Sequence, residues 1–261
     1  MERQTYGYLL IAWAGVAGGV FIALQFLTAP YGRHARPGWG PTMHRTAGWV
    51  IMESPAVLVF VACYLVSDRR LDPVAIVFLV LWLLHYVYRA FIYPFRLRGG
   101  QLRMPVSIMT MAFLFNVMNG YLQGRGLFTL GPARGTEWFS DPRFILGLLL
   151  FLGGYALNQQ SDIILRSLRI PGESGYRIPY GGGFGLVSCP NYFGELVEWL
   201  GWAILTWSPA GLVFFVWTAA NLVPRARAHH RWYLGRFPGY PRERKAVIPW
   251  LYQIQLAPAR V

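Results

Sequence analysis

Hydrophobic and polar positions occur in long blocks along this chain. Mostly apolar stretches of about twenty residues recur between shorter polar segments, and a helix of that length crosses the hydrocarbon core of a bilayer. We identify seven such spans, at about 6–29, 46–66, 73–95, 104–122, 143–165, 191–208 and 209–224. The pattern therefore predicts an all-α, integral membrane bundle of seven transmembrane helices, built as one domain over residues 1–261.

Composition and charge set the orientation of this bundle. The chain is 55% hydrophobic and 13% charged, about half the charged fraction of a soluble domain. A net charge of +13 could indicate a nucleic-acid partner, but the basic residues are scattered between apolar spans and form no soluble basic face. Seventeen of the 24 Lys and Arg residues fall on the side of the C-terminus and six on the other. The positive-inside rule then places the N-terminus outside and the C-terminus in the cytosol.

Other features of the sequence indicate in which membrane the protein lies and which kinds of site it lacks. The first span has no short apolar core followed by a small-residue cleavage site, so it is predicted to be a spanning helix. Arg greatly outnumbers Lys, which suggests a GC-rich genome and a bacterial inner membrane, or the endoplasmic reticulum membrane in a eukaryote. Cys63 lies within a span and Cys189 in a glycine-rich loop, which supports neither a disulfide framework nor a metal site. No nucleic-acid or obligate protein partner is expected.

Glu53 is the one charge in the span at 46–66. A carboxylate at membrane depth costs about 2.5–3.5 kcal/mol on insertion scales, so a buried partner, a bound proton or a reaction must offset that cost. Pro55 removes a backbone donor and frees a carbonyl one turn earlier, which predicts a kinked or open helix. The sequence thus indicates a polar site inside the bundle.

Two further polar stripes lie in the third and fifth spans. Tyr86, Arg89 and Tyr93 have helical spacing and share one face; an aromatic belt with a snorkelling arginine is an equally good interpretation of that spacing alone. A second stripe leaves the fifth span on one helix face, and it begins at membrane depth, which argues against a merely solvated helix. It comprises Asn158, Asp162, Arg166 and Arg169.

Three more signals follow toward the C-terminus. The segment 171–185 has six glycines in fifteen residues, which excludes a helix, and on its own fits a flexible connector. Asn191, Glu195 and Glu198 share a helix face, with solvation in headgroup water as the alternative. A last group at four-residue intervals precedes a basic tail that could bind anionic lipid: Arg225, His229 and Tyr233. Together the stripes predict a bundle whose cytosolic half accepts a large anionic cofactor beside an apolar substrate.

These residues resemble the steroid 5α-reductase family of membrane-embedded, NADPH-dependent reductases. The resemblance runs from about Trp49 to the C-terminus and is densest over 158–249. Parts of the C-terminal pattern are similar to a wider group of membrane enoyl-CoA reductases, sterol reductases and isoprenylcysteine methyltransferases. The Glu53-Ser54-Pro55 and His85-Tyr86 segments are typical of the 5α-reductases.

The resemblance implies reduction of the 4,5 double bond of a 3-oxo-Δ4-steroid that enters from the bilayer. Glu53 and Tyr86 match the family's pair that binds the substrate ketone, with Met52 where the family usually has Gln. Residues at about 46–122 would form the substrate side, and about 143–250 the NADPH-binding part. The residues expected to bind NADPH are Trp49, Arg89, Tyr93, Asn158, Asp162, Arg166, Arg169, Tyr176, Arg177, Asn191, Glu195, Arg225, His229 and Tyr233.

Other functions remain open from the sequence. A reductase of an enoyl-CoA or of another sterol double bond would use the same cofactor with a different acceptor. A methyltransferase that uses S-adenosylmethionine shares the C-terminal pattern but needs no acid beside a substrate carbonyl. A seven-helix transporter or receptor could use Glu53 as a proton or ligand site, but it leaves the Arg- and Gly-rich cytosolic segment unexplained.

Overall fold

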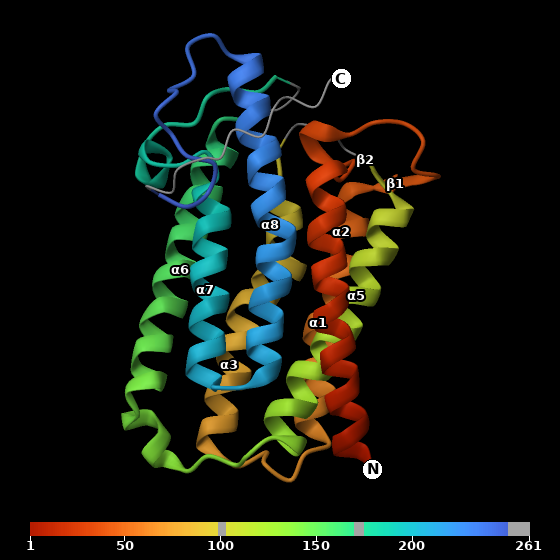
Figure 1. Ribbon diagram of the computed structural model, residues 1–261, viewed down its shortest axis with the longest axis vertical. Helices are drawn as coiled ribbons and strands as arrows, with labels where there is room; N and C mark the ends of the chain where they lie inside the picture. The colour runs from red at the N-terminus through yellow and green to blue at the C-terminus, as the bar shows by residue number, and fades with distance from the viewer. Residues whose placement is uncertain (99–102, 170–174, 250–261) are drawn as a thin grey trace.

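The computed structural model describes residues 1–98, 103–169 and 175–249. Within these ranges seven long helical segments run along the longest axis of the molecule, with the N-terminus at one end (Figure 1). The helices are α1 (Glu2–Phe26), α2 (Arg45–Leu65), α3 (Pro73–Val87), α4 (Tyr93–Arg96), α5 (Val106–Arg125), α6 (Pro142–Ser167), α7 (Pro190–Thr206) and α8 (Pro209–Arg236). Short turns of 3-10 helix are η1 (Gly32–His34), η4 (Thr136–Ser140) and η5 (Gly182–Gly185), and two strands, β1 (Thr42–His44) and β2 (Arg103–Pro105), pair antiparallel.

Membrane-spanning character is clearest in three of these helices. Glu2–Phe26, Arg45–Leu65 and the combined segment Pro73–Arg96 are long and apolar enough to cross a bilayer. The later helices carry more polar groups, many of which face inward and are buried, such as Asn116 and Asn119 on α5 and Asp162 on α6. The predicted all-α class is therefore confirmed, and the last helix is longer than its predicted span because α8 continues to Arg236.

Glycines allow α6 and α7 to approach each other closely. A Cβ on Gly147 would lie 2.4 Å from the backbone nitrogen of Leu205, and one on Gly154 would lie 2.3 Å from that of Glu198. Small residues at such contacts let helix backbones pack without intervening side chains. This close packing fixes the register of α6 against α7, and so sets Asp162 and Asn158 opposite the carboxyl-bearing face of α7.

The third span contains a turn that the sequence did not predict. Five residues after α3 form a π-helical turn, η2 (Tyr88–Ile92), before α4 begins. A π turn adds a residue to the helical repeat and often occurs at a functional site. The span predicted at 73–95 therefore corresponds to one helical segment, Pro73–Arg96, and Arg89 lies within its π turn.

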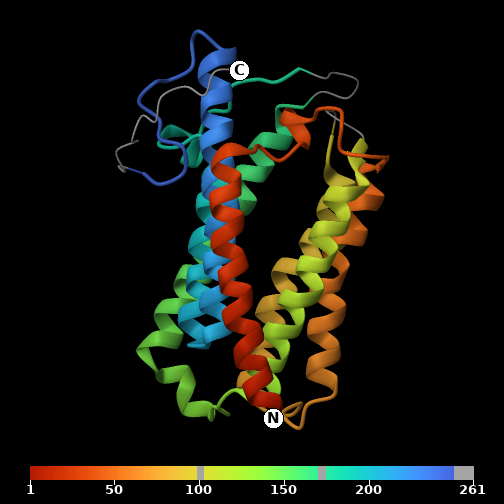
Figure 2. The ribbon, with the colours of Figure 1, turned by 45° about the vertical axis from the view of Figure 1, so that its right-hand side comes forward.

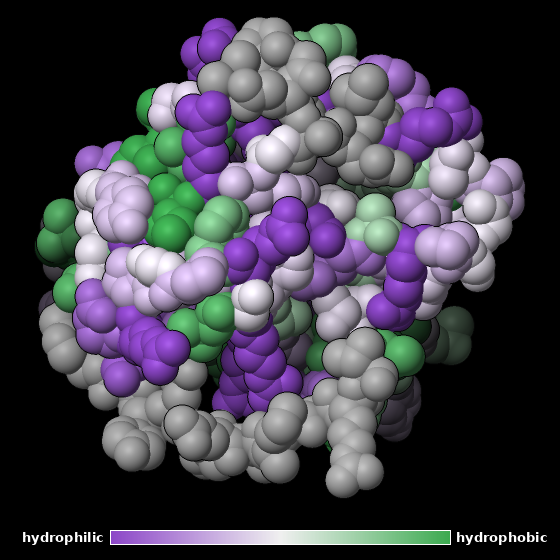
Figure 3. Space-filling view, turned by 90° about the horizontal axis from the view of Figure 1, so that it is seen from above, coloured by the Kyte–Doolittle hydropathy of each residue, from purple (hydrophilic) through white to green (hydrophobic). Residues whose placement is uncertain are grey.

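Long connections, among them the one between α1 and α2, lie at the end opposite the N-terminus, whereas the α2–α3 and α5–α6 connections lie at the N-terminal end (Figures 1 and 2). At the end opposite the N-terminus, the glycine-rich segment before α7 is bound to the segment after α8 by backbone hydrogen bonds from Ser188 to Lys245 (2.8 Å) and from Cys189 to Ala246 (3.1 Å). Ser188 Oγ also lies 2.6 Å from both His230 Nδ1 and Tyr240 Oη. Hydrophilic side chains are spread across this end when it is viewed along the bundle (Figure 3).

Candidate functional site

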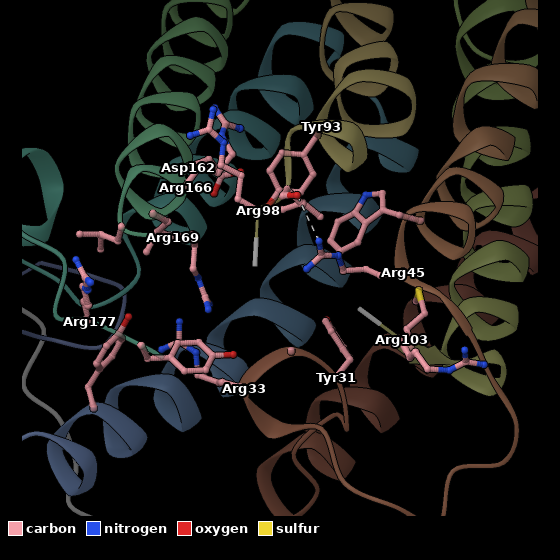
Figure 4. Close-up of a pocket in the computed structure, with 18 residues that line it drawn as sticks. Tyr31, Arg33, Arg45, Tyr93, Arg98, Arg103, Asp162, Arg166, Arg169 and Arg177 are labelled. Atoms are coloured by element: carbon pink, nitrogen blue, oxygen red, sulfur yellow. Dashed lines mark hydrogen bonds between the residues drawn. The ribbon is translucent and has the colours of Figure 1, made fainter. Parts of the chain in front are cut away.

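A cavity opens at the loop-rich end of the bundle (Figure 4). Its walls come from the α1–α2 connection, the N-terminal turns of α2, the segment around α4 and β2, the end of α6 and the glycine-rich segment. Seven arginines line it, and Asp162 is the single carboxylate among the described lining residues. The lining residues are Tyr31, Gly32, Arg33, Arg45, Trp49, Tyr93, Leu97, Arg98, Arg103, Met104, Asp162, Leu165, Arg166, Leu168, Arg169, Tyr176, Arg177 and Tyr233.

The inner wall of this cavity is built around Arg89. Its guanidinium carbon lies 4.8 Å from the ring centre of Trp49 and 4.7 Å from that of Tyr93, and its Nη1 lies 3.8 Å from Asp162 Oδ2. Cation–π contacts and the ion pair hold the guanidinium in place. The aromatic-belt interpretation is therefore wrong for Arg89, since it points to a buried carboxylate and not to the headgroups.

Glu53 lies deeper in the bundle, on α2. The Asn116 side chain on α5 donates from Nδ2 to Glu53 Oε2 (3.2 Å) and to the Met52 carbonyl (2.7 Å). Ser54 Oγ donates to the Ile51 carbonyl (3.1 Å), the group that Pro55 leaves without its helical partner. The helix stays continuous through Pro55. Glu53 is within electrostatic range of Arg89, His85 and Glu195, which connects it to the inner wall of the cavity.

Tyr86 lies on α3 among aromatic rings and is 4% exposed. Its ring centre is 4.6 Å from that of Trp82, 4.9 Å from His85 and 5.6 Å from Trp199. Glu53 and Arg89 are among the charged groups within its electrostatic range. The structure thus places the two residues that the resemblance assigns to the substrate ketone within electrostatic range of each other.

His85 and Glu198 form a fully buried pair next to Tyr86. His85 Nδ1 lies 2.7 Å from Glu198 Oε1, with side chains 5% and 0% exposed. This contact links α3 to α7 immediately before the π turn. The headgroup-water interpretation of Glu198 is therefore wrong.

The amide and carboxyl groups of α6 and α7 also meet. Asn158 donates from Nδ2 to the Asn191 carbonyl (3.0 Å), and Asn191 donates from Nδ2 to Asp162 Oδ1 (3.4 Å). Glu195 interacts electrostatically with Arg89. Asn158 and Asn191 therefore support the cavity from behind Asp162 and do not line it.

Arg225 and His229 on α8 belong to a second chain of contacts outside the cavity lining. Arg225 donates from Nε to Tyr192 Oη (3.0 Å), which lies 3.1 Å from His229 Nε2. His229 Nδ1 then lies 2.9 Å from His34 Nε2. Burial, with Arg225 and Arg33 nearby, lowers the pKa of His34 to about 4, and burial together with Arg33 and Arg225 places the pKa of His229 well below its ordinary value. The two imidazoles are therefore neutral near pH 7 and close the α1–α2 connection against α8.

The sequence identified much of this site but missed one side of it. Eight of the residues expected to bind the cofactor line the cavity: Trp49, Tyr93, Asp162, Arg166, Arg169, Tyr176, Arg177 and Tyr233. The residues that sequence reasoning missed come from the α1–α2 connection and the segment around α4, namely Tyr31, Arg33, Arg45, Arg98 and Arg103. The four arginines among them entered the sequence analysis only through the positive-inside count, although their position on one side of the bundle indicated a common site. Asn116 was also missed, and its spacing with Asn119 and Gln123 along one face of α5 could have shown it.

Comparison of the sequence with known proteins identifies the family of this chain. The sequence profile of the 3-oxo-5-alpha-steroid 4-dehydrogenases matches residues 102–252. The chain is 43% identical over 255 residues to steroid 5-alpha-reductase DET2 of Gossypium hirsutum, covering 96% of this chain and 99% of the relative. It is 43% identical over 258 residues to the protein of the same name from Arabidopsis thaliana, covering 96% and 98%. It is 40% identical over 253 residues to 3-oxo-5-alpha-steroid 4-dehydrogenase 1 of Homo sapiens, covering 96% and 97%.

These matches extend over nearly the whole chain and agree with the predicted multi-pass membrane fold. The chain therefore belongs to the 3-oxo-5-alpha-steroid 4-dehydrogenase family, the steroid 5-alpha-reductases, which confirms the predicted family and its oxidoreductase class.

Proposed function

We propose that this protein is an NADPH-dependent reductase of the 4,5 double bond of 3-oxo-Δ4-steroids. The observation that carries the proposal is the continuity between two regions. The arginine-lined cavity reaches Trp49 and Tyr93, whose rings contact Arg89. Arg89 is in turn within electrostatic range of Glu53 and Tyr86. A cofactor with phosphates at one end and a reactive ring at the other fits a site with this order of groups.

The residues present fit NADPH. Guanidinium groups bind phosphate oxygens through paired N–H donors, and seven of them face one cavity. Arg33 Nη1 and Trp49 Nε1 are buried without a hydrogen-bond partner among the described residues. A buried donor without an acceptor is costly, so a bound ligand that supplies acceptors would stabilise both. Arg166 and Arg169 would hold the phosphates, and Trp49 and Tyr93 would pack near the nicotinamide end.

Glu53 and Tyr86 would act on the C3 ketone of the steroid. Tyr86 donates its O–H to the carbonyl oxygen, and Glu53 donates from its protonated form. When bound, NADPH supplies the hydride that C5 receives. Negative charge then develops on the C3 oxygen, where preorganised donors in a dry site are most effective. Protonation at C4 by a proton from water completes the reduction.

Asn116 would orient the Glu53 carboxyl for this step. Its hydrogen bond to Glu53 Oε2 fixes one oxygen, and its bond to the Met52 carbonyl fixes the amide itself. The family usually has Gln where this chain has Met52. In this chain the side-chain amide that contacts Glu53 comes instead from Asn116 on α5. We infer that Asn116 contributes a polar contact that Met52 cannot.

We further propose that the cavity faces the cytosol of a bacterial cell, with the N-terminus on the other side of the inner membrane. The excess of Lys and Arg at the loop-rich end supports this orientation, and a cytosolic cofactor would reach the cavity from that side. Labelling of single introduced cysteines at 3 and 242 by a membrane-impermeant reagent in whole cells tests this topology. Labelling at 242 but not at 3 in intact cells would contradict it.

One experiment separates the reductase from the other functions. The protein is purified in detergent, bound nucleotide is identified by mass spectrometry, and NADPH oxidation is followed with a panel of enones. We expect NADPH oxidation that depends on a Δ4-3-ketosteroid. Turnover with enoyl thioesters alone, copurified S-adenosylmethionine, or binding of no nucleotide would support the other functions instead.

A further inference from the structure

Three aromatic rings hold the guanidinium of Arg33. Its central carbon lies 5.2 Å from the ring centre of Tyr176, 5.0 Å from that of Trp232 and 4.6 Å from that of Tyr233. Arg33 itself is in η1, in the connection between α1 and α2. Cation–π contacts and stacking restrict a guanidinium plane. Two segments that are distant from Arg33 in sequence therefore fix this cationic group at the wall of the cavity.

The guanidinium of Arg33 retains an unused hydrogen-bond donor. Arg33 Nη1 is buried and has no hydrogen-bond acceptor among the described residues. The surrounding rings and a side-chain hydrogen bond with Tyr233 satisfy the charge of the group in part, and Nη1 remains without an acceptor. The position is preorganised for a ligand that brings its own oxygen acceptors.

A second guanidinium shares the same ring. Arg169 lies with its central carbon 4.1 Å from the ring centre of Tyr176, so Arg33 and Arg169 both contact that ring. Arg177 lies at the same end of the cavity, and Arg45 and Arg103 lie toward the other (Figure 4). Asp162, the carboxylate of the described lining, is paired with Arg89 at the inner wall. Like charges gathered in this way suit a dianion, and a phosphate monoester carries about −1.5 to −2 charges near pH 7.

The position of this group along the cavity indicates which phosphate it meets. Asp162 and Arg169 are seven residues apart on and just beyond α6, which is about 10 Å along the helix axis. If the nicotinamide lies at the inner wall near Glu53, the adenosine end of the cofactor lies toward Arg169 and Arg33. We propose that Arg33, with Arg169, binds the 2′-phosphate of NADPH and makes the site select NADPH over NADH. This inference rests on the proposed function.

The test measures binding without turnover. Calorimetry gives the Kd of NADPH and of NADH for the wild type, Arg33→Gln and Arg36→Gln, with no steroid present. Arg36 is exposed, lies three residues further in the same connection and is not among the residues that line the cavity. We expect Arg33→Gln to weaken NADPH binding about tenfold or more and to change NADH binding less than about twofold. Arg36→Gln should change neither.

Each other outcome overturns the inference in a recognisable way. An Arg33→Gln protein that keeps the wild-type preference for NADPH would assign selection to another residue. If Arg33→Gln weakened the binding of NADPH and NADH equally, Arg33 would have a role common to both cofactors and would not select between them. NADH binding that stays at the wild-type level is the evidence that the variant folds. If the wild type bound NADPH and NADH equally well, the inference would be wrong but the proposed reductase function would stand. If the wild type bound neither nucleotide, the proposed function would be wrong as well.

Discussion

The inner site and the outer cavity of this protein have opposite charge patterns. In the inner site one guanidinium, Arg89, interacts with three carboxyl groups, those of Glu53, Glu195 and Asp162. In the outer cavity seven guanidiniums face Asp162 as the single carboxylate of the described lining. Acid groups are thus in excess where a ketone would bind, and basic groups are in excess where phosphates would bind.

Because of this difference, substitutions in the two regions should affect different steps of the reaction. Excess carboxyl groups in a buried site can hold protons and donate hydrogen bonds to a neutral oxygen. Excess guanidiniums need an external anion. Changes to the inner site should therefore lower kcat with little effect on cofactor affinity, and changes to the outer cavity should do the reverse.

The largest effect is expected from Glu53→Gln. The amide retains the shape of the carboxyl but cannot act as an acid, so kcat for a Δ4-3-ketosteroid should fall by about 10²–10³. The Kd of NADPH should stay within about twofold, because Glu53 does not line the cavity. Steady-state kinetics and calorimetry check the two halves of this prediction. An unchanged kcat would exclude Glu53 from the reaction.

The reverse pattern is expected from Arg169→Gln. Loss of a charge-assisted hydrogen bond to phosphate should raise the Kd of NADPH about tenfold to a hundredfold. At saturating NADPH, kcat should remain near the wild-type value. Arg143→Gln is the matched control, since Arg143 lies at the opposite end of the bundle and is paired with Asp141 (2.7 Å). If Arg169→Gln lowered kcat and left the Kd alone, the comparison between the two regions would be wrong.

A smaller effect is expected from Asn116→Ala. It removes one hydrogen bond to the Glu53 carboxyl and one to the Met52 carbonyl, and such bonds contribute about 0.5–1.5 kcal/mol each. We expect kcat to fall about two- to tenfold. Because the role of Asn116 is to orient Glu53, Asn116→Ala in the Glu53→Gln background should cost much less than in the wild type. If the two substitutions lowered kcat independently, so that their fold-changes multiplied in the double variant, that role would be contradicted.

The smallest effect concerns pH and the closure of the outer cavity. The pKa of His34 is lowered from 6.5 to about 4 in the folded protein, so the unfolded protein binds the extra proton more readily. The resulting stability is fully present above pH 6.5 and is lost as the pH falls toward about 4. The Tm of the wild type should therefore fall between about pH 7.5 and about pH 5, and the Tm of His34→Gln should fall less. An equal fall in both proteins would show that other groups set the pH dependence.

Much of the fold was predictable because insertion into a membrane requires long apolar helices. All seven spans correspond to helices. The polar stripe lies on α6 from Asn158 to Arg166, with Arg169 just beyond the end of the helix, and Asp162, Arg166 and Arg169 line the cavity. The π turn at Arg89 and the Asn116 contact to Glu53 were not predicted, because both depend on how α2, α3 and α5 pack. The α1–α2 connection was missed for a related reason: Arg33 joins the site only through contacts with rings from two distant segments.

We propose that this protein transfers a hydride from NADPH to C5 of a steroid whose C3 ketone is bound by Glu53 and Tyr86. The most direct measurement uses purified protein, NADPH deuterated at the transferable position and a 3-oxo-Δ4-steroid, with the product analysed by mass spectrometry and NMR. We predict a saturated 5α-ketone with deuterium at C5, formed by the wild type and far more slowly by Glu53→Gln. Deuterium at C4, or a product formed without transfer of the label, would contradict the mechanism.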